Sequence, residues 1–112
     1  MDKKVVYRPE RDILYVNMGE RVKETVPKGG FNIDLSHDGK IVGVEILDAS
    51  EVIGDVLDED VSPILENLED ADVLMKEHRG MVFMVLKMYA DMGGTETERA
   101  VSLELPQPQA AT

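Results

Sequence analysis

The sequence has no cysteine, no tryptophan and only five other aromatic residues, three tyrosines and two phenylalanines. The absence of cysteine excludes disulfide bonds, thiolate catalysis and Cys-ligated zinc sites. No apolar run approaches the roughly 20 residues that cross a bilayer, and the opening residues, MDKKVVY, lack the apolar core of a signal peptide. We therefore expect a soluble, cytoplasmic protein with no membrane partner.

Basic residues are also scarce: 12 Lys and Arg stand against 23 Asp and Glu, for a net charge of −11. Because phosphate backbones recruit Lys and Arg, this balance argues against direct binding of nucleic acid. A basic protein or a cation is the electrostatically complementary partner. Surplus acid also keeps a small domain soluble when it has no partner at all.

The segment 31–50, FNIDLSHDGKIVGVEILDAS, predicts a β-hairpin. Its turn is Asp38-Gly39, read as a two-residue type I′ turn because both residues tolerate positive φ. The pairs expected from this turn are His37 with Lys40, Ser36 with Ile41, Leu35 with Val42, Asp34 with Gly43, Ile33 with Val44, Asn32 with Glu45 and Phe31 with Ile46. Since side chains alternate along a strand, this register gathers the apolar residues on one face.

Further strands are expected on either side of this hairpin. Residues 3–7 and 13–18 form a first hairpin around a charged turn, a third strand begins within 22–26, and 27–30 break the chain. Short connections favour sequence neighbours as sheet neighbours. The first half is therefore expected to be an antiparallel β-meander of about five strands.

Apolar spacing changes to three and four residues after residue 47, which predicts helix. Ser62 followed by Pro63 indicates an N-cap with proline at the first helical position, and this helix should run to about Glu69. An earlier single turn is expected to start at Ser50 and to end at Gly54.

Residues 73–89 fit two structures. A helix would place several of the apolar residues on one face, whereas a hairpin around Arg79-Gly80 would make two strands. The continuously apolar, β-branched run MVFMVLKMY favours the strands. The pairs expected for that hairpin are Asp72 with Lys87, Val73 with Leu86, Leu74 with Val85 and Met75 with Met84.

The fold class predicted is therefore α+β. It comprises an antiparallel β-meander sheet with one or two short helices, a C-terminal β-hairpin, a loop at 92–97 and a final strand at 101–105. Residues 1–105 are expected to form a single domain: a β-meander over 1–50, helix over 51–70 and strands over 71–105. Residues 106–112 are expected to be a disordered tail.

Three groups of side chains have candidate chemistry, each with a simpler structural explanation. An acidic cluster lacks the ligand spacing of a calcium loop and suits a solvated helix start. Two histidines beside different turns could join a metal site, and two carboxylates on one face of the central hairpin could act as acid and base. These groups are Asp55, Asp58, Glu59 and Asp60; His37 and His78; and Asp34 and Glu45. We assign no catalytic, cofactor-binding or metal-binding residue and expect no cofactor.

Two stretches, YRPERDILYVNM and GGFNIDLSHDGKIVGVEILDAS, resemble the small family known as domain of unknown function 2283. Arg11 departs from the small residue that members often have there. The resemblance implies a sheet-rich α+β domain, and some relatives occur beside small toxin-like proteins. The matching residues are Tyr7, Pro9, Asp12, Leu14, Tyr15, Asp34, Gly39, Gly43, Glu45, Ile46, Leu47, Asp48, Ala49 and Ser50.

The function expected first is a non-enzymatic protein–protein interaction module that forms a homodimer through an exposed strand or the surface of residues 81–88. The alternative, from the resemblance, is an antitoxin-like acidic neutraliser of a basic protein such as a small ribonuclease. A metal-binding or hydrolytic protein is the least favoured reading, so an enzyme is not expected.

Overall fold

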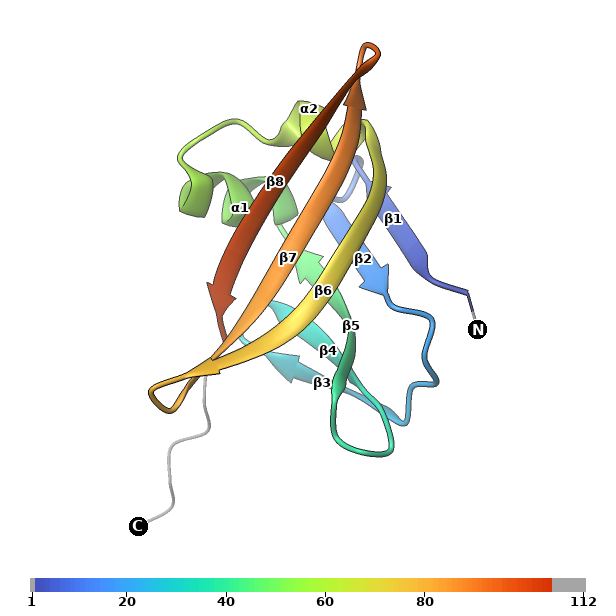
Figure 1. The fold of residues 1–112 in the computed structure, drawn as a ribbon, viewed down its shortest axis with the longest axis vertical. Coiled ribbons are helices and arrows are strands. Elements are labelled where there is room, and N and C mark those ends of the chain that lie inside the picture. Colours follow the sequence, from blue (N-terminus) through green and yellow to red (C-terminus); the bar gives the residue numbers. More distant parts are fainter. Residues whose placement is uncertain (1, 106–112) are drawn as a thin grey trace.

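The computed structural model describes residues 2–105 and contains two antiparallel sheets that pack against each other, with two short helices at one end (Figure 1). The elements are β1 (Lys4–Arg8), β2 (Ile13–Asn17), β3 (Glu24–Lys28), β4 (Phe31–Leu35), β5 (Ile41–Leu47), α1 (Ala49–Leu57), α2 (Ser62–Glu66), β6 (Leu68–His78), β7 (Met81–Met92) and β8 (Thr95–Glu104). This arrangement confirms the α+β fold class. No helix within the described residues has the length and apolar character needed to span a membrane. The tail expected at 106–112 lies outside those residues.

The first sheet has five strands in the order β1-β2-β5-β4-β3. It departs from the expected meander at one connection, because β5 rather than β3 lies beside β2. The reason is burial: β5 contains Val42, Val44 and Ile46, each at most 2% exposed, and a central strand is covered better than an edge strand. The polar strand β3 takes the edge instead.

The central hairpin has the expected pairing from Phe31–Ile46 to Asp34–Gly43, but its turn is different. The backbone N–H of Ser36 donates to Lys40 O, that of Gly39 donates to Ser36 O, and Gly39 has φ +77°. These bonds define a three-residue loop with glycine in the left-handed region, a turn that Asp-Gly suits equally well. The loop shifts the register by one residue and a bulge restores it. The pairs Leu35–Val42, Ser36–Ile41 and His37–Lys40 were therefore wrong, and Leu35 pairs with Ile41.

Both helices differ in extent from the expectation. α1 runs through Gly54, which the sequence had marked as its end, and stops at Asp58 in the left-handed region. A β-carbon at Gly54 would lie 2.9 Å from Glu59 O, so the glycine admits the chain as it folds back over the helix. α2 has Ser62 as its first residue rather than its cap, and it ends at Glu66 because Asn67 bonds back to Pro63 O.

The second sheet has three long strands in the order β6-β7-β8. All four pairs expected around Arg79-Gly80 are present, so the strand interpretation of residues 73–89 is confirmed and the helical one was wrong. The loop expected at 92–97 is a tight Gly93-Gly94 turn, where both residues have positive φ and Gly94 N–H donates to Asp91 Oδ1. β8 consequently begins at Thr95, six residues earlier than expected.

The core lies between the two sheets and under the helices. β6 crosses β5, β2 and β1, while α2 packs on β7 and α1 on β8. Met84, Leu86 and Met88 of β7 are fully buried there. The residues alternating with them point to the other side of the sheet, the outer face of the three-stranded sheet.

Candidate functional site

A buried carboxylate lies on the outer face of the five-stranded sheet, the side away from the core. Asp34 of β4 is only 5% exposed. Its Oδ2 accepts hydrogen bonds from Tyr15 Oη at 2.8 Å and Asn17 Nδ2 at 3.4 Å, and its Oδ1 accepts one from Thr25 Oγ1 at 2.7 Å. Three strands besides β4 thus frame this network, because Gly43 of β5 lies between Asp34 and Asn17.

Gly43 makes room for the network. A β-carbon there would lie 2.7 Å from Asp34 Oδ2 and 3.0 Å from both Asn17 Nδ2 and Val16 O. Burial and the hydrogen bond to Asp34 together raise the pKa of Tyr15. The phenol therefore stays protonated and acts as a donor, and the arrangement holds strands together rather than presenting a reactive group.

Glu45 was expected to share this face with Asp34 as an acid–base pair. Both side chains lie on that face, but Glu45 accepts a hydrogen bond from Asn32 Nδ2 at 2.8 Å, whereas Asp34 is bonded to other residues. Beside Glu45, a shallow groove of about 340 Å³ runs to the edge strand β1. Its lining residues are Lys4, Val6, Arg8, Ile13, Tyr15 and Glu45.

A second network ties the β1–β2 turn to the start of α1. Asp12 Oδ1 accepts from Tyr7 Oη at 2.7 Å and from the Ser50 N–H at 2.9 Å, while Oδ2 accepts from Ser50 Oγ at 2.6 Å. Asp12 O also accepts from Ala49 N–H. Burial disfavours the charged form of Asp12, but the hydrogen bonds from Ser50 and Tyr7 outweigh it and lower the pKa. The N-cap residue of α1, Asp48, makes no side-chain cap hydrogen bond, so Asp12 from a distant turn provides the capping acceptors instead.

The acidic cluster between the helices has structural contacts instead of a metal geometry. Asp58 ends α1, Glu59 forms an ion pair with Arg99, and Asp60 Oδ1 accepts from Ser62 N–H. Nowhere among residues 2–105 do three or more His, Asp or Glu side chains converge as metal ligands would. The two histidines, His37 and His78, are exposed in separate turns.

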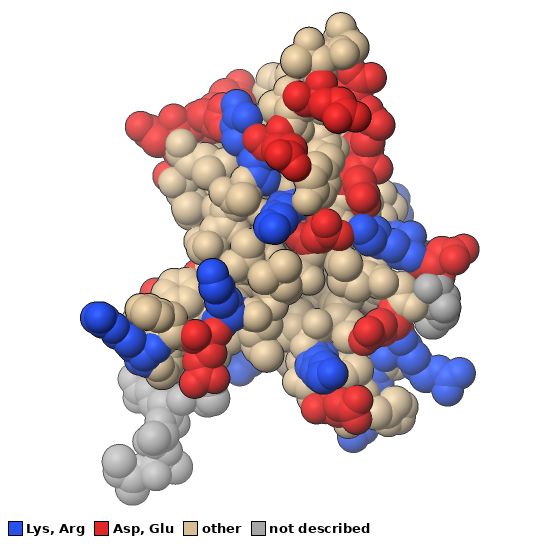
Figure 2. Space-filling model, viewed as in Figure 1, with Lys and Arg blue, Asp and Glu red and all other residues tan. Residues whose placement is uncertain are grey.

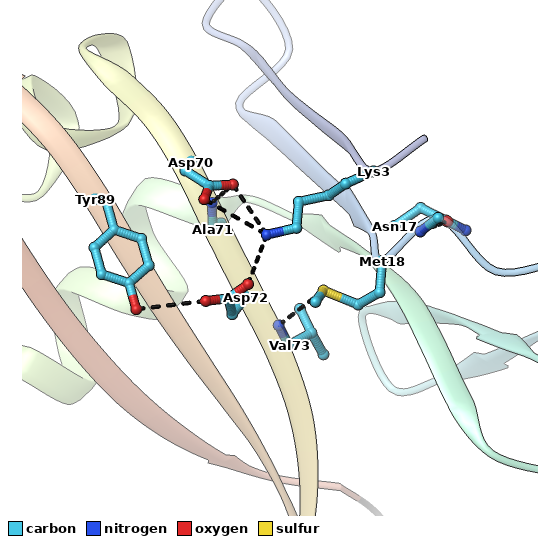
Figure 3. A network of polar contacts seen from close by, with 9 residues as sticks. Lys3, Asn17, Met18, Asp70, Ala71, Asp72, Val73 and Tyr89 are labelled. Atoms are coloured by element: carbon cyan, nitrogen blue, oxygen red, sulfur yellow. Dashed lines mark hydrogen bonds and ion pairs between the residues drawn. The ribbon is translucent and has the colours of Figure 1, made fainter. Parts of the chain in front are cut away.

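An acidic groove of about 440 Å³ lies at the α2 end of the three-stranded sheet. Lys3 reaches into this region: its Nζ lies 2.7 Å from Asp72 Oδ1 and 3.2 Å from Asp70 Oδ1 (Figure 3). Tyr89 Oη donates to Asp72 Oδ2 at 3.4 Å. Sequence reasoning missed this groove, although the alternation of acids at 70 and 72 and at 96 and 98 was a signal for it. The lining residues are Glu69, Asp70, Asp72, Tyr89, Ala90, Glu96, Thr97 and Glu98.

The middle of the same outer face is apolar. Leu74 is 41% exposed, it pairs directly with the half-buried Val85, and Phe83 lies two residues from Val85 on the same face. Figure 2 shows this area largely without charge, with acidic side chains concentrated towards the β7–β8 turn. Of the surface expected at 81–88, only alternate residues contribute here, because the others are in the core.

Comparison with known families identifies the first part of the chain. The model of the family described as "Protein of unknown function (DUF2283)" matches residues 4–50, which confirms the resemblance there. The matched segment contains both polar networks, the one around Asp34 and the one around Asp12. No curated protein and no solved structure gives a significant match.

Proposed function

We propose that this protein is a non-enzymatic interaction module that self-associates through the outer face of its three-stranded sheet. The observation that supports the proposal best is Leu74, a large apolar side chain that is 41% exposed midway along the edge strand β6, against Val85 and beside Phe83. Large exposed apolar patches are typical of protein contacts, and Leu74, Val85 and Phe83 are the adjacent apolar side chains on this face.

The position of the patch adds to this argument. Leu74 lies on an edge strand, and the central strand beside it has apolar side chains on both faces. One face is covered by the core, whereas the other has no cover from the described residues. A strand with two apolar faces gains most when both are buried.

Sedimentation equilibrium of the wild-type chain and of Leu74→Asp tests the proposal. We expect the wild type to have the mass of a dimer and Leu74→Asp that of a monomer, because the new carboxylate would lie unpaired in the interface. Val56→Asp is the matched control: Val56 is also apolar and 53% exposed, but it lies on α1, so this variant should remain dimeric. A monomeric wild type at high concentration would rule the proposal out.

A second candidate function is the binding of a basic protein by the acidic groove, as an antitoxin-like neutraliser would do. The observation in its favour is that the groove region already binds one ammonium group, that of Lys3. Affinity capture from the native lysate should then recover a small basic protein in a complex that dissociates in salt. The double variant Glu96→Gln/Glu98→Gln should recover less of it, and recovery of the bait alone would count against this function.

A further inference from the structure

We infer that the two copies in the proposed dimer lie face to face about a two-fold axis that runs across the strands in the interface. This arrangement rests on the proposed function and adds its geometry. It places the basic tip of the β6–β7 hairpin of one copy over the acidic end of the sheet of its partner.

Along the outer face of the three-stranded sheet, acidic side chains lie at one end of β6 and basic side chains at the other. Since alternate residues of β6 point outward, they can be followed from the α2 end to the hairpin tip. Two acids come first, then an apolar residue, then a lysine and a histidine. In order they are Asp70, Asp72, Leu74, Lys76 and His78. The neighbouring outward residues of β7 are Tyr89, Lys87, Val85, Phe83 and Met81.

Two stacked sheets that share a two-fold axis in their interface have two simple choices, with strands nearly aligned in either case. With the axis across the strands, each strand lies antiparallel over the same strand of the partner, so β6 lies over the partner's β6. Centred on the Leu74–Val85 row, this axis places Lys76 over the partner's Asp72 and His78 over the partner's Asp70. Strands rise about 3.3 Å per residue, so these contacts lie about 7 and 13 Å from the axis.

The same axis also suits β7. Lys87 lies over the ring of the partner's Phe83, where an ammonium group is favoured, and Val85 meets Val85. At the centre, Leu74 meets Leu74. The apolar residues therefore bury one another while opposite charges meet on both sides.

An axis along the strands is electrostatically worse. It places β6 over the partner's β8, so Asp70 lies over Glu98, and it stacks Lys87 on Lys87. The opposite pair of Lys76 with Glu104 would form twice, against two contacts of Asp70 with Glu98 and one of Lys87 with Lys87. Repulsion at the other contacts favours the axis across the strands.

Charge reversal distinguishes the two axes. Lys76→Glu and Asp72→Lys should each weaken the dimer about tenfold or more, because each homodimer then has two like-charge contacts. When the two variants are mixed, both contacts become opposite again, and a heterodimer of wild-type affinity should form. Glu104→Lys is the matched control and should change affinity less than about twofold, since this residue lies over Ala100 in the inferred arrangement.

Each outcome has one reading, provided that thermal unfolding shows the variants folded. Suppose that the wild type is a dimer and that Leu74→Asp dissociates it, but that mixing Lys76→Glu with Asp72→Lys does not restore affinity. This result overturns the arrangement and leaves the proposed function standing. If Glu104→Lys weakens the dimer and mixing it with Lys76→Glu restores affinity, the axis runs along the strands, and this result also overturns the arrangement. A monomeric wild type overturns both. The pair His78→Glu and Asp70→Lys repeats the test if Asp72→Lys does not fold.

Discussion

The outer faces of the two sheets differ in how their side chains are shielded from solvent. On the five-stranded sheet the central polar group, Asp34, is 5% exposed and has its hydrogen-bond donors within the chain. On the three-stranded sheet the corresponding side chain, Leu74 midway along the edge strand β6, is apolar and 41% exposed. The polar network of the first face is therefore satisfied within a single copy, whereas Leu74 is the exposed side chain on which the proposed self-association depends.

This difference separates residues that define the fold from residues available for binding. The segment that matches the family, residues 4–50, contains both polar networks. The apolar patch and the acidic groove lie in β6, β7 and β8, beyond that segment. Substitutions in the first region should therefore change stability, and substitutions in the second should change association.

The largest effect on stability is expected for Asp34→Ala. It leaves the hydroxyl groups of Tyr15 and Thr25 and the amide of Asn17 without their common acceptor, at a cost of about 3 kcal/mol. Asp72→Ala on the other sheet is the control and should cost less than about 1 kcal/mol, because Asp72 is partly exposed to solvent. Urea unfolding measures both, and equal losses would contradict the distinction between the two faces.

Gly43→Ala should cost about 2 kcal/mol, since its new methyl group meets Asp34, Asn17 and the carbonyl of Val16. The double variant Gly43→Ala/Asp34→Ala provides the control. Removing the carboxylate relieves part of the clash. The double variant should therefore lose less unfolding free energy than the sum of the losses in the two single variants. Strict additivity would mean that the glycine does not make room for Asp34.

Local patterns predicted the hairpins well. Arg79-Gly80 determined every expected pair of β6 with β7, because a register follows from its turn. Asp38-Gly39 located the central hairpin but not its turn type, since a glycine at positive φ suits both a two-residue and a three-residue loop. The bulge that compensates for the difference has no signature in the sequence.

Features that depend on distant residues could not be predicted. The position of β5 beside β2 depends on burial within the whole sheet. Asp34 was recognised as lying on the outer face, but its burial depends on Tyr15 and Thr25, which come from two other strands. In the same way, nothing near Ser50 indicates that Asp12 caps α1.

Asp12→Asn should cost about 1 kcal/mol at neutral pH, because the amide nitrogen that replaces one carboxylate oxygen cannot accept a hydrogen bond from Ser50 and the negative charge at the start of α1 is lost. The pKa of Asp12 is lowered in the folded chain from an ordinary value of 3.8, so its contribution is fully present above that value. It is lost as the pH falls below 3.8 through the folded pKa. The difference in unfolding free energy between wild type and Asp12→Asn should thus be constant near neutrality and shrink below about pH 4. A difference that grows in acid would contradict this assignment.

Lys3→Met should have the smallest effect, about 0.5 kcal/mol, although Lys3 joins the N-terminal side of β1 to Asp70 and Asp72 of β6. The pKa of Lys3 is raised, chiefly by its hydrogen bond to Asp72, but the ammonium group is exposed and solvent screens the pair. The loss should disappear in 1 M salt, where the screening length is about 3 Å. Because Lys3 also occupies the carboxylates that would receive the partner's Lys76 and His78, Lys3→Met should strengthen dimerisation while it weakens folding. If Lys3→Met raises the dimer affinity measured by sedimentation and lowers the free energy of unfolding in urea, the acidic end has a binding role distinct from its structural role. If both quantities fall, Asp72 serves the fold alone.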